Sequence, residues 1–149
     1  MTPLWNHELS ATPYTIYTNT NSMDAAVGQP DGSSKLCLSC HDGTVAIDNY
    51  GGHTSTETPL GGSDNLGNNL SNDHPISFVY DANLASNDIE LFNPTVASSG
   101  LGGTIHADML ENSKMQCSSC HDVHNGSGIS KLLLKGNGGS ALCLTCHDK

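Results

Sequence analysis

Residues 37–42 of this chain are CLSCHD, residues 117–122 are CSSCHD and residues 143–148 are CLTCHD. The 149-residue chain has six cysteines, and these three copies of one pattern contain all of them. In each copy two residues separate the cysteines, and a histidine and an aspartate follow the second cysteine directly. A chain whose cysteines all occur in one repeated pattern uses them for one repeated chemistry.

Three chemistries compete for a Cys-x-x-Cys pair: a disulfide framework, a zinc site and covalent haem attachment. A disulfide framework gives no reason for a histidine after every pair. Zinc uses cysteine and histidine ligands, and three pairs allow one or two sites, but adjacent Cys and His residues would crowd one tetrahedral ion. Haem attachment uses both cysteines and the histidine of every copy, so it is the preferred interpretation.

The spacing therefore predicts three covalently bound c-type haems. Both thiols of a pair form thioethers with the haem vinyl groups, and the histidine that follows lies beneath the macrocycle as the proximal iron ligand. The first haem is assigned to Cys37, Cys40 and His41, the second to Cys117, Cys120 and His121, and the third to Cys143, Cys146 and His147.

The aspartate after each proximal histidine, at Asp42, Asp122 and Asp148, has two interpretations. It could tune the imidazole as a hydrogen-bonding carboxylate, or it could cap the local backbone at a turn. A side chain adjacent to the ligand points poorly at the ligand's ring, which favours the cap.

Five further histidines are available as second axial ligands: His7, His53, His74, His106 and His124. A haem with an open axial position can bind small molecules, whereas one with two axial side chains passes electrons. Methionine is another candidate ligand, and it would raise the reduction potential relative to histidine.

The position of His124 allows a geometric argument. It lies three residues after His121, and three residues extend at most roughly 10 Å, too little to pass from one face of a porphyrin to the other. If His124 binds iron, that iron belongs to another haem, either the third, which is close in sequence, or the first. The alternative is a surface histidine beside an Asn-Gly turn.

His74 and His7 are the other preferred candidates. Pro75 favours extended backbone at His74, and the apolar residues that follow are typical of a short strand, so His74 suits a haem face or is a loop histidine at a strand start. Trp5 and two leucines surround His7 and would cover a porphyrin or form ordinary core contacts. His53 and His106 are second choices, and we expect three bis-histidine haems.

The composition favours a small, loop-rich protein. Hydrophobic residues make up 36% and aromatic residues 5%, and sixteen glycines are present, so the apolar core is small and the haems are expected to replace it. We expect one triheme cytochrome domain over residues 1–149, mostly irregular coil with a few short helices and strands. Strands are expected at 14–18, 44–48 and 76–80, and helical turns at 107–116 and from Ile129 to an end at Gly136.

The net charge excludes some partners. Fifteen acidic residues oppose five lysines, with no arginine, which gives a formal charge of −10 that repels nucleic acid and anionic membranes. No apolar run approaches the roughly 18 residues of a transmembrane helix. The start MTPLWNHELS lacks the features of a secretory signal, so we expect that a signal has been removed or that the sequence is incomplete.

Several segments resemble multihaem c-type cytochromes of the doubled Cys-x-x-Cys-His class of prokaryotes: PLWNHE, SSKLCLSCHDGTVAID, NDHPISFVYD, MQCSSCHDVHN and ALCLTCHDK. Some members of this group form extracellular cytochrome filaments. The resemblance implies that His7, His74 and His124 are distal ligands. Similar proteins often carry another haem site just before the Trp-Asn-His segment, and this sequence begins where that site would end.

Electron transfer is the function expected from these features, and an enzymatic role is not. A haem reductase would need a five-coordinate iron, which the surplus of histidines disfavours. Covalent haem attachment occurs outside the cytoplasm, so we expect a periplasmic or extracellular location, with redox proteins or extracellular acceptors as partners. The resemblance and the surplus of histidines suggest self-association into a filament, with a monomeric electron carrier as the alternative.

Overall fold

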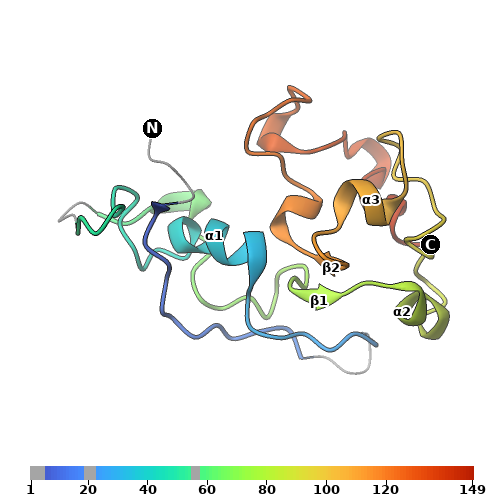
Figure 1. Cartoon of the computed structure of the whole chain (residues 1–149), viewed down its shortest axis with the longest axis horizontal. Helices are drawn as coiled ribbons and strands as arrows, with labels where there is room; N and C mark the ends of the chain where they lie inside the picture. Colours follow the sequence, from blue (N-terminus) through green and yellow to red (C-terminus); the bar gives the residue numbers. More distant parts are fainter. Residues whose placement is uncertain (1–5, 19–22, 55–57) are drawn as a thin grey trace. The chain divides into compact units, whose positions relative to one another are not determined.

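The computed structural model describes residues 6–18, 23–54 and 58–149 (Figure 1). Regular structure is sparse in this part of the chain: three α-helices of five to ten residues, two strands of two residues each and several 3-10 turns, joined by coil. The expected fold of mostly irregular coil with few short elements is confirmed. No helix in the described ranges is long and apolar enough to cross a bilayer.

The chain forms two compact units. The first comprises Met1–Thr18 and Val27–Pro75, and the second comprises Asn19–Ala26 and Ile76–Lys149. The first Cys-x-x-Cys-His motif lies in the first unit, and the other two motifs lie together in the second. The organisation as one triheme domain stays a prediction.

The first unit is built around helix α1, Gly32–His41, with the 3-10 helix η2, Gly62–Asp64, later in the chain. Residues 14–18 do not form the expected strand; only Thr15 pairs, in a single bridge with Asn69. Residues 44–48 likewise contribute one bridge, between Ala46 and Pro59. Both strand predictions are wrong because each segment meets a partner at a single residue.

The interior of the first unit is unusually polar. Its buried hydrophobic residues are Tyr14, Leu38, Ala46 and Leu70, and its buried polar residues are at least as many: His7, Ser10, Ser34, Ser39, Asp42 and Asn49. Apolar burial is the dominant stabilising contribution in most folds, and among the described residues of this unit four hydrophobic side chains are buried. This agrees with the expectation that a bound cofactor supplies part of the core.

The second unit contains the sheet. Strand β1, Phe78–Val79, pairs antiparallel with β2, Lys114–Met115, in a register that places Phe78 opposite Met115 (Figure 1). The strand expected at 76–80 is therefore confirmed over its central residues.

Two short helices complete the frame of the second unit. In α2, Ala82–Asn87, the Asp81 carboxylate caps the first turn by accepting from Leu84 N at 2.9 Å. In α3, Ile105–Met109, the Thr104 hydroxyl accepts from Ala107 N at 3.2 Å. The helix expected at 107–116 starts earlier and ends at Met109, because Leu110 is already extended, with φ −104° and ψ 137°. Asn112 and Ser113, with φ angles of 52° and 61°, then turn the chain into β2.

The apolar core of the second unit joins these elements to the last motif. It consists of Phe78, Tyr80, Leu84, Ile105, Met109, Met115, Leu142 and Cys146. The remaining elements are 3-10 turns: η3, Cys117–Ser119; η4, Ser130–Leu132; η5, Gly138–Ser140; and η6, Cys143–Thr145. The helical turn expected from Ile129 to Gly136 is reduced to η4, and η5 lies beyond its expected end. One haem-motif cysteine, Cys146, is itself part of the core.

Candidate haem-attachment sites

Each motif lies on a helical turn that brings its two cysteines to one side. The first motif occupies the last turn of α1, and the second and third begin η3 and η6. In η3, Cys120 N and His121 N donate to the Cys117 carbonyl at 3.2 and 3.0 Å. In η6 the matching bonds to the Cys143 carbonyl are 3.1 and 3.0 Å. Residues three apart on a helical turn are neighbours, so this geometry presents both thiols to one macrocycle edge.

The cysteines form no disulfide bonds with one another, and those of the second and third motifs affect each other's pKa. All six cysteines are free. Burial raises the pKa of the Cys120 thiol, and the Cys143 and Cys117 thiols add to that rise. Burial also raises the pKa of Cys146 to about 11, with Cys120 as the next cause. The two attachment turns of the second unit therefore lie side by side.

Backbone carbonyls orient two of the proximal histidines. The His41 Nδ1–H group donates to the Asp64 carbonyl at 2.8 Å, and that of His121 donates to the Lys131 carbonyl at 2.9 Å. A carbonyl can only accept, so the proton is on Nδ1 and the lone pair is on Nε2. Metal-bound histidines have this arrangement, in which the second ring nitrogen donates to a carbonyl or carboxylate. The donor set of two thiols and one imidazole therefore fits a covalently bound haem.

The same loops also pair with the backbone of the two motifs. Leu66 N donates to the His41 carbonyl at 2.7 Å, next to the Asp64 contact. Leu134 N donates to the Cys120 carbonyl at 2.9 Å, and Asp122 N to the Leu132 carbonyl at 2.7 Å. At His41 and His121, a later segment of the chain thus bonds both the imidazole ring and the backbone of the motif.

The third motif is anchored by the chain that follows α2. Phe92 N donates to the Cys146 carbonyl at 2.9 Å, and Asp148 N to the Glu90 carbonyl at 2.8 Å. Tyr80, only 1% exposed, donates its hydroxyl to the Phe92 carbonyl at 2.6 Å. These bonds fix His147 within a paired segment, where it forms a bridge with Leu91.

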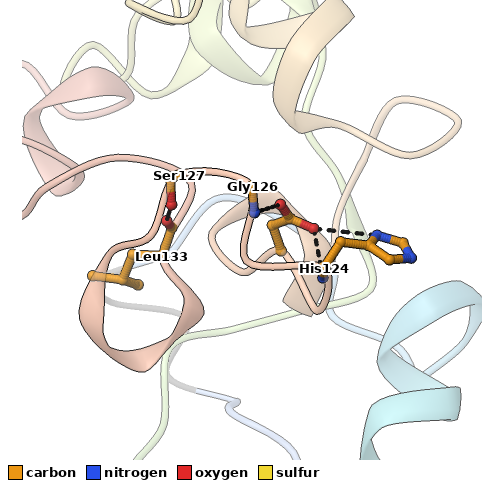
Figure 2. A network of polar contacts seen from close by, with 5 residues as sticks. His124, Gly126, Ser127 and Leu133 are labelled. Atoms are coloured by element: carbon orange, nitrogen blue, oxygen red, sulfur yellow. Dashed lines mark hydrogen bonds and ion pairs between the residues drawn. The ribbon is translucent and has the colours of Figure 1, made fainter.

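Two of the motif aspartates cap local backbone. The Asp122 carboxylate accepts from His124 N at 2.9 Å and from Gly126 N at 2.8 Å, as the dashed lines in Figure 2 show. These backbone bonds are the main cause that lowers the pKa of the Asp122 carboxyl. Asp42 accepts from Thr44 N at 2.9 Å. For these two residues the geometry agrees with the capping interpretation.

Asp42 has a further partner that the sequence pattern does not indicate. It is 4% exposed, and the hydroxyl of Tyr14 donates to its Oδ2 at 2.6 Å. Burial on its own would raise the pKa of the Asp42 carboxyl, but hydrogen bonds from Ser10, Tyr14 and Thr44 outweigh it and lower the pKa. Burial, followed by the bond to Asp42, raises the pKa of Tyr14 to about 12. The residue after His41 is thus a buried ionised group at the centre of a hydrogen-bond network.

The three preferred distal histidines have different surroundings. His7 is buried, with Nδ1 2.8 Å from the Glu8 carbonyl and Nε2 3.0 Å from the Ala46 carbonyl. A neutral imidazole can donate to only one of them. His74 is exposed, with Nδ1 2.8 Å from the Pro75 carbonyl.

The His124 side chain is 91% exposed, and its Nδ1 lies 3.4 Å from Asp122 Oδ1. Figure 2 shows this ring projecting from the turn that also contains Gly126 and Ser127. Of the two second-choice distal ligands, His106 contacts the Ser113 hydroxyl through Nε2 at 3.0 Å, and His53 is an exposed loop residue. The assignment of distal ligands stays a prediction.

A zinc interpretation has no matching geometry in the described residues. Among residues 6–18, 23–54 and 58–149, no three side chains of His, Cys, Asp or Glu are grouped so that they could hold a metal ion. A structural zinc site needs four such ligands.

Residues 106–149 match a family model described as the doubled CXXCH motif. The matched region contains the second and third motifs, whereas the first lies outside it. A comparison with curated proteins gives no match. The family match indicates covalently attached c-type haem and supports the class of multihaem electron-transfer cytochromes.

Proposed function

We propose that the chain transfers electrons through three covalently bound c-type haems, each with two axial histidines, and that it is not an enzyme. The observation that carries the proposal is the repeated helical turn, in which two thiols share one side, with the following imidazole held through Nδ1 at His41 and His121. When bound, the haem supplies an iron that accepts and releases one electron. The chain's own residues fix its position, provide axial nitrogen ligands and limit the access of water.

The placement of two motifs in one unit supports transfer between haems. The second and third motifs lie in the same compact unit, where Cys143 raises the pKa of the Cys120 thiol and Cys120 raises that of Cys146. Haems attached to them are neighbours, so an electron passes between them without a diffusing carrier. His7, His74 and His124 close the remaining axial positions in this proposal.

A filament role is the finer part of the proposal. Its support is the resemblance to cytochromes that form extracellular filaments, together with the exposure of His124, whose ring is available to a haem other than its own. Such a protein is exported to the periplasm or the cell surface and meets redox proteins or extracellular acceptors. Electron micrographs that show only monomers of the haem-loaded protein at high concentration would refute the filament role and favour a monomeric electron carrier.

Haem content and ligation test the central proposal. Mature protein from a host that attaches c-type haem should have an intact mass corresponding to the chain plus three haems. Its spectrum should be low-spin in both redox states, and the reduced protein should not bind carbon monoxide. A mass equal to that of the bare chain would refute haem attachment. Carbon monoxide binding would instead show an open iron and favour a reductase.

A further inference from the structure

A lysine is fixed against the third attachment turn. Lys135 is half-buried, and its Nζ donates to the Ser99 carbonyl at 2.8 Å and to the Thr145 hydroxyl at 2.9 Å. Thr145 lies between the two cysteines of the third motif and donates its own proton to the Ala141 carbonyl at 3.0 Å. The ammonium group is thus held on the same short turn that attaches the haem.

The other two motifs have no such contact at the matching position. Ser39, before the second cysteine of the first motif, donates to the Lys35 carbonyl at 2.7 Å. Ser119, in the second motif, accepts from Gln116 N at 2.9 Å. Both hydroxyls therefore bind backbone groups, whereas the hydroxyl of Thr145 also binds a cation. In a chain with five lysines and a net charge of −10, this distinguishes the third site.

The charge of Lys135 reaches the thiol to which the haem would be bonded. Burial raises the pKa of Cys146 most, and Lys135 acts in the opposite direction, as a positive charge near a thiol does. The two hydrogen-bond acceptors of Nζ are neutral, so they hold the ammonium without cancelling its charge. The carboxylate associated with this loop, Asp108, instead accepts from Ser99 Oγ and Gly103 N.

A fixed cation in a partly dehydrated site favours the reduced state of a nearby redox group, because reduction adds a negative charge. Solvent screens this effect strongly at an exposed position and weakly at a buried one. The potential of a protein-bound haem depends on burial and on its surroundings. Lys135 is partly dehydrated because it is half-buried, and it is fixed in position by its two hydrogen bonds.

We infer that Lys135 raises the reduction potential of the haem attached at Cys143 and Cys146, an inference that rests on the proposed haem attachment. The step is a one-electron reduction of ferric to ferrous iron by an external reductant or a neighbouring haem. Lys135 stays protonated throughout, so no proton is exchanged.

The test compares K135M with the wild type in the haem-loaded protein by spectroelectrochemical titration. One of the three potentials should fall, so that the oxidised-to-reduced ratio of that haem at fixed applied potential rises several-fold. K135R keeps the charge and should keep the potential. K149M is the matched control, because Lys149 has the same charge but is 59% exposed and is paired with Glu90 at 2.6 Å; it should shift the potentials much less.

The affected haem can be assigned by removing it. In a C143S/C146S background, which should carry two haems, adding K135M should leave both remaining potentials unchanged. Unchanged potentials in K135M with three haems present would overturn the inference and leave the proposed function intact. An equal shift in K149M would also overturn it, because the effect would then follow net charge. Absence of haem in the wild type would instead refute the proposed function.

Two further measurements apply if K135M does not mature. T145V keeps the lysine and its bond to the Ser99 carbonyl but removes its bond to the Thr145 hydroxyl, and it should lower the same potential by less than the loss of charge would. Brief acetylation of the folded wild type, followed by peptide mass spectrometry, should modify Lys135 more slowly than Lys149. A T145V protein with unchanged potentials, or equal acetylation of the two lysines, would overturn the inference.

Discussion

Replacing Tyr14 with phenylalanine should loosen the turn that follows the first haem motif. The Tyr14 hydroxyl donates to the buried, ionised Asp42 at 2.6 Å, and Tyr14 itself is 5% exposed. The aromatic ring, over which Lys35 Nζ lies at 5.3 Å from the centroid, is retained in Y14F. The substitution therefore removes one hydrogen bond with little change in packing.

The size of the effect follows from the charge of the acceptor. A hydrogen bond to a charged group contributes roughly 1.5–3 kcal/mol. Asp42 keeps its bonds from Thr44 N and Thr44 Oγ1 in the variant, so a loss of about 2 kcal/mol is expected within that range. Because 1.4 kcal/mol is a factor of ten in an equilibrium constant, this loss corresponds to an equilibrium constant for local opening that is about 30-fold larger.

Amide hydrogen exchange of the haem-loaded protein measures this opening directly. Peptides that cover residues 38–46 should exchange about 30-fold faster in Y14F than in the wild type, while peptides of the second unit should be unchanged. Y50F is the matched control, because the Tyr50 side chain is 40% exposed. If Y14F and Y50F exchange alike over residues 38–46, the proposed contribution of the Tyr14–Asp42 bond is refuted.

Three further predictions concern haem number, the core and alkaline pH. C117S/C120S should mature with two haems instead of three by intact mass, and a mass with three haems would show that this pair is not an attachment site. Ile105→Ala, at a fully buried position, should lower the free energy of urea unfolding by roughly 2–5 kcal/mol. Val96→Ala, at a position 75% exposed, should change it by less than about 0.5 kcal/mol, and similar losses in both variants would contradict the assigned core. Because the pKa of Tyr14 is raised to about 12 in the folded chain, its contribution to stability should be complete below about pH 10 and decline as pH rises through 12. The difference in stability between wild type and Y14F should narrow over that interval, and a constant difference up to pH 12 would contradict this placement of Tyr14.

The nine attachment residues stay a prediction, and the sequence allows that prediction because the chemistry is local. Two cysteines and a histidine within five positions form a haem motif, and the structure adds the helical turn on which each motif lies. Sparse regular structure was also predictable from the many glycine and polar residues. The strand at Phe78–Val79 followed from a short apolar run after Pro75.

Features that depend on polar burial or on single backbone contacts were not predictable. Helix α1 has no apolar periodicity because Ser34 and Ser39 share its buried face with Leu38. Helix α3 ends early because Leu110 is extended, and Asn112 and Ser113 then take left-handed backbone angles that the helical pattern does not reveal. The bond between Tyr14 and Asp42 joins residues from distant parts of the first unit, and no local signal marks it.

Because backbone carbonyls hold two of the proximal histidines, the length of the intervening loops should matter more than their side chains. The His41 and His121 rings are held by the main chain of residues 64 and 131, so replacing either side chain leaves the oxygen in place, provided that residue 131 tolerates its φ of 63°. Inserting or deleting one residue between a motif and its anchor would instead carry the oxygen away from the ring. Among relatives, we expect these two loops to vary in amino-acid sequence while their lengths stay constant.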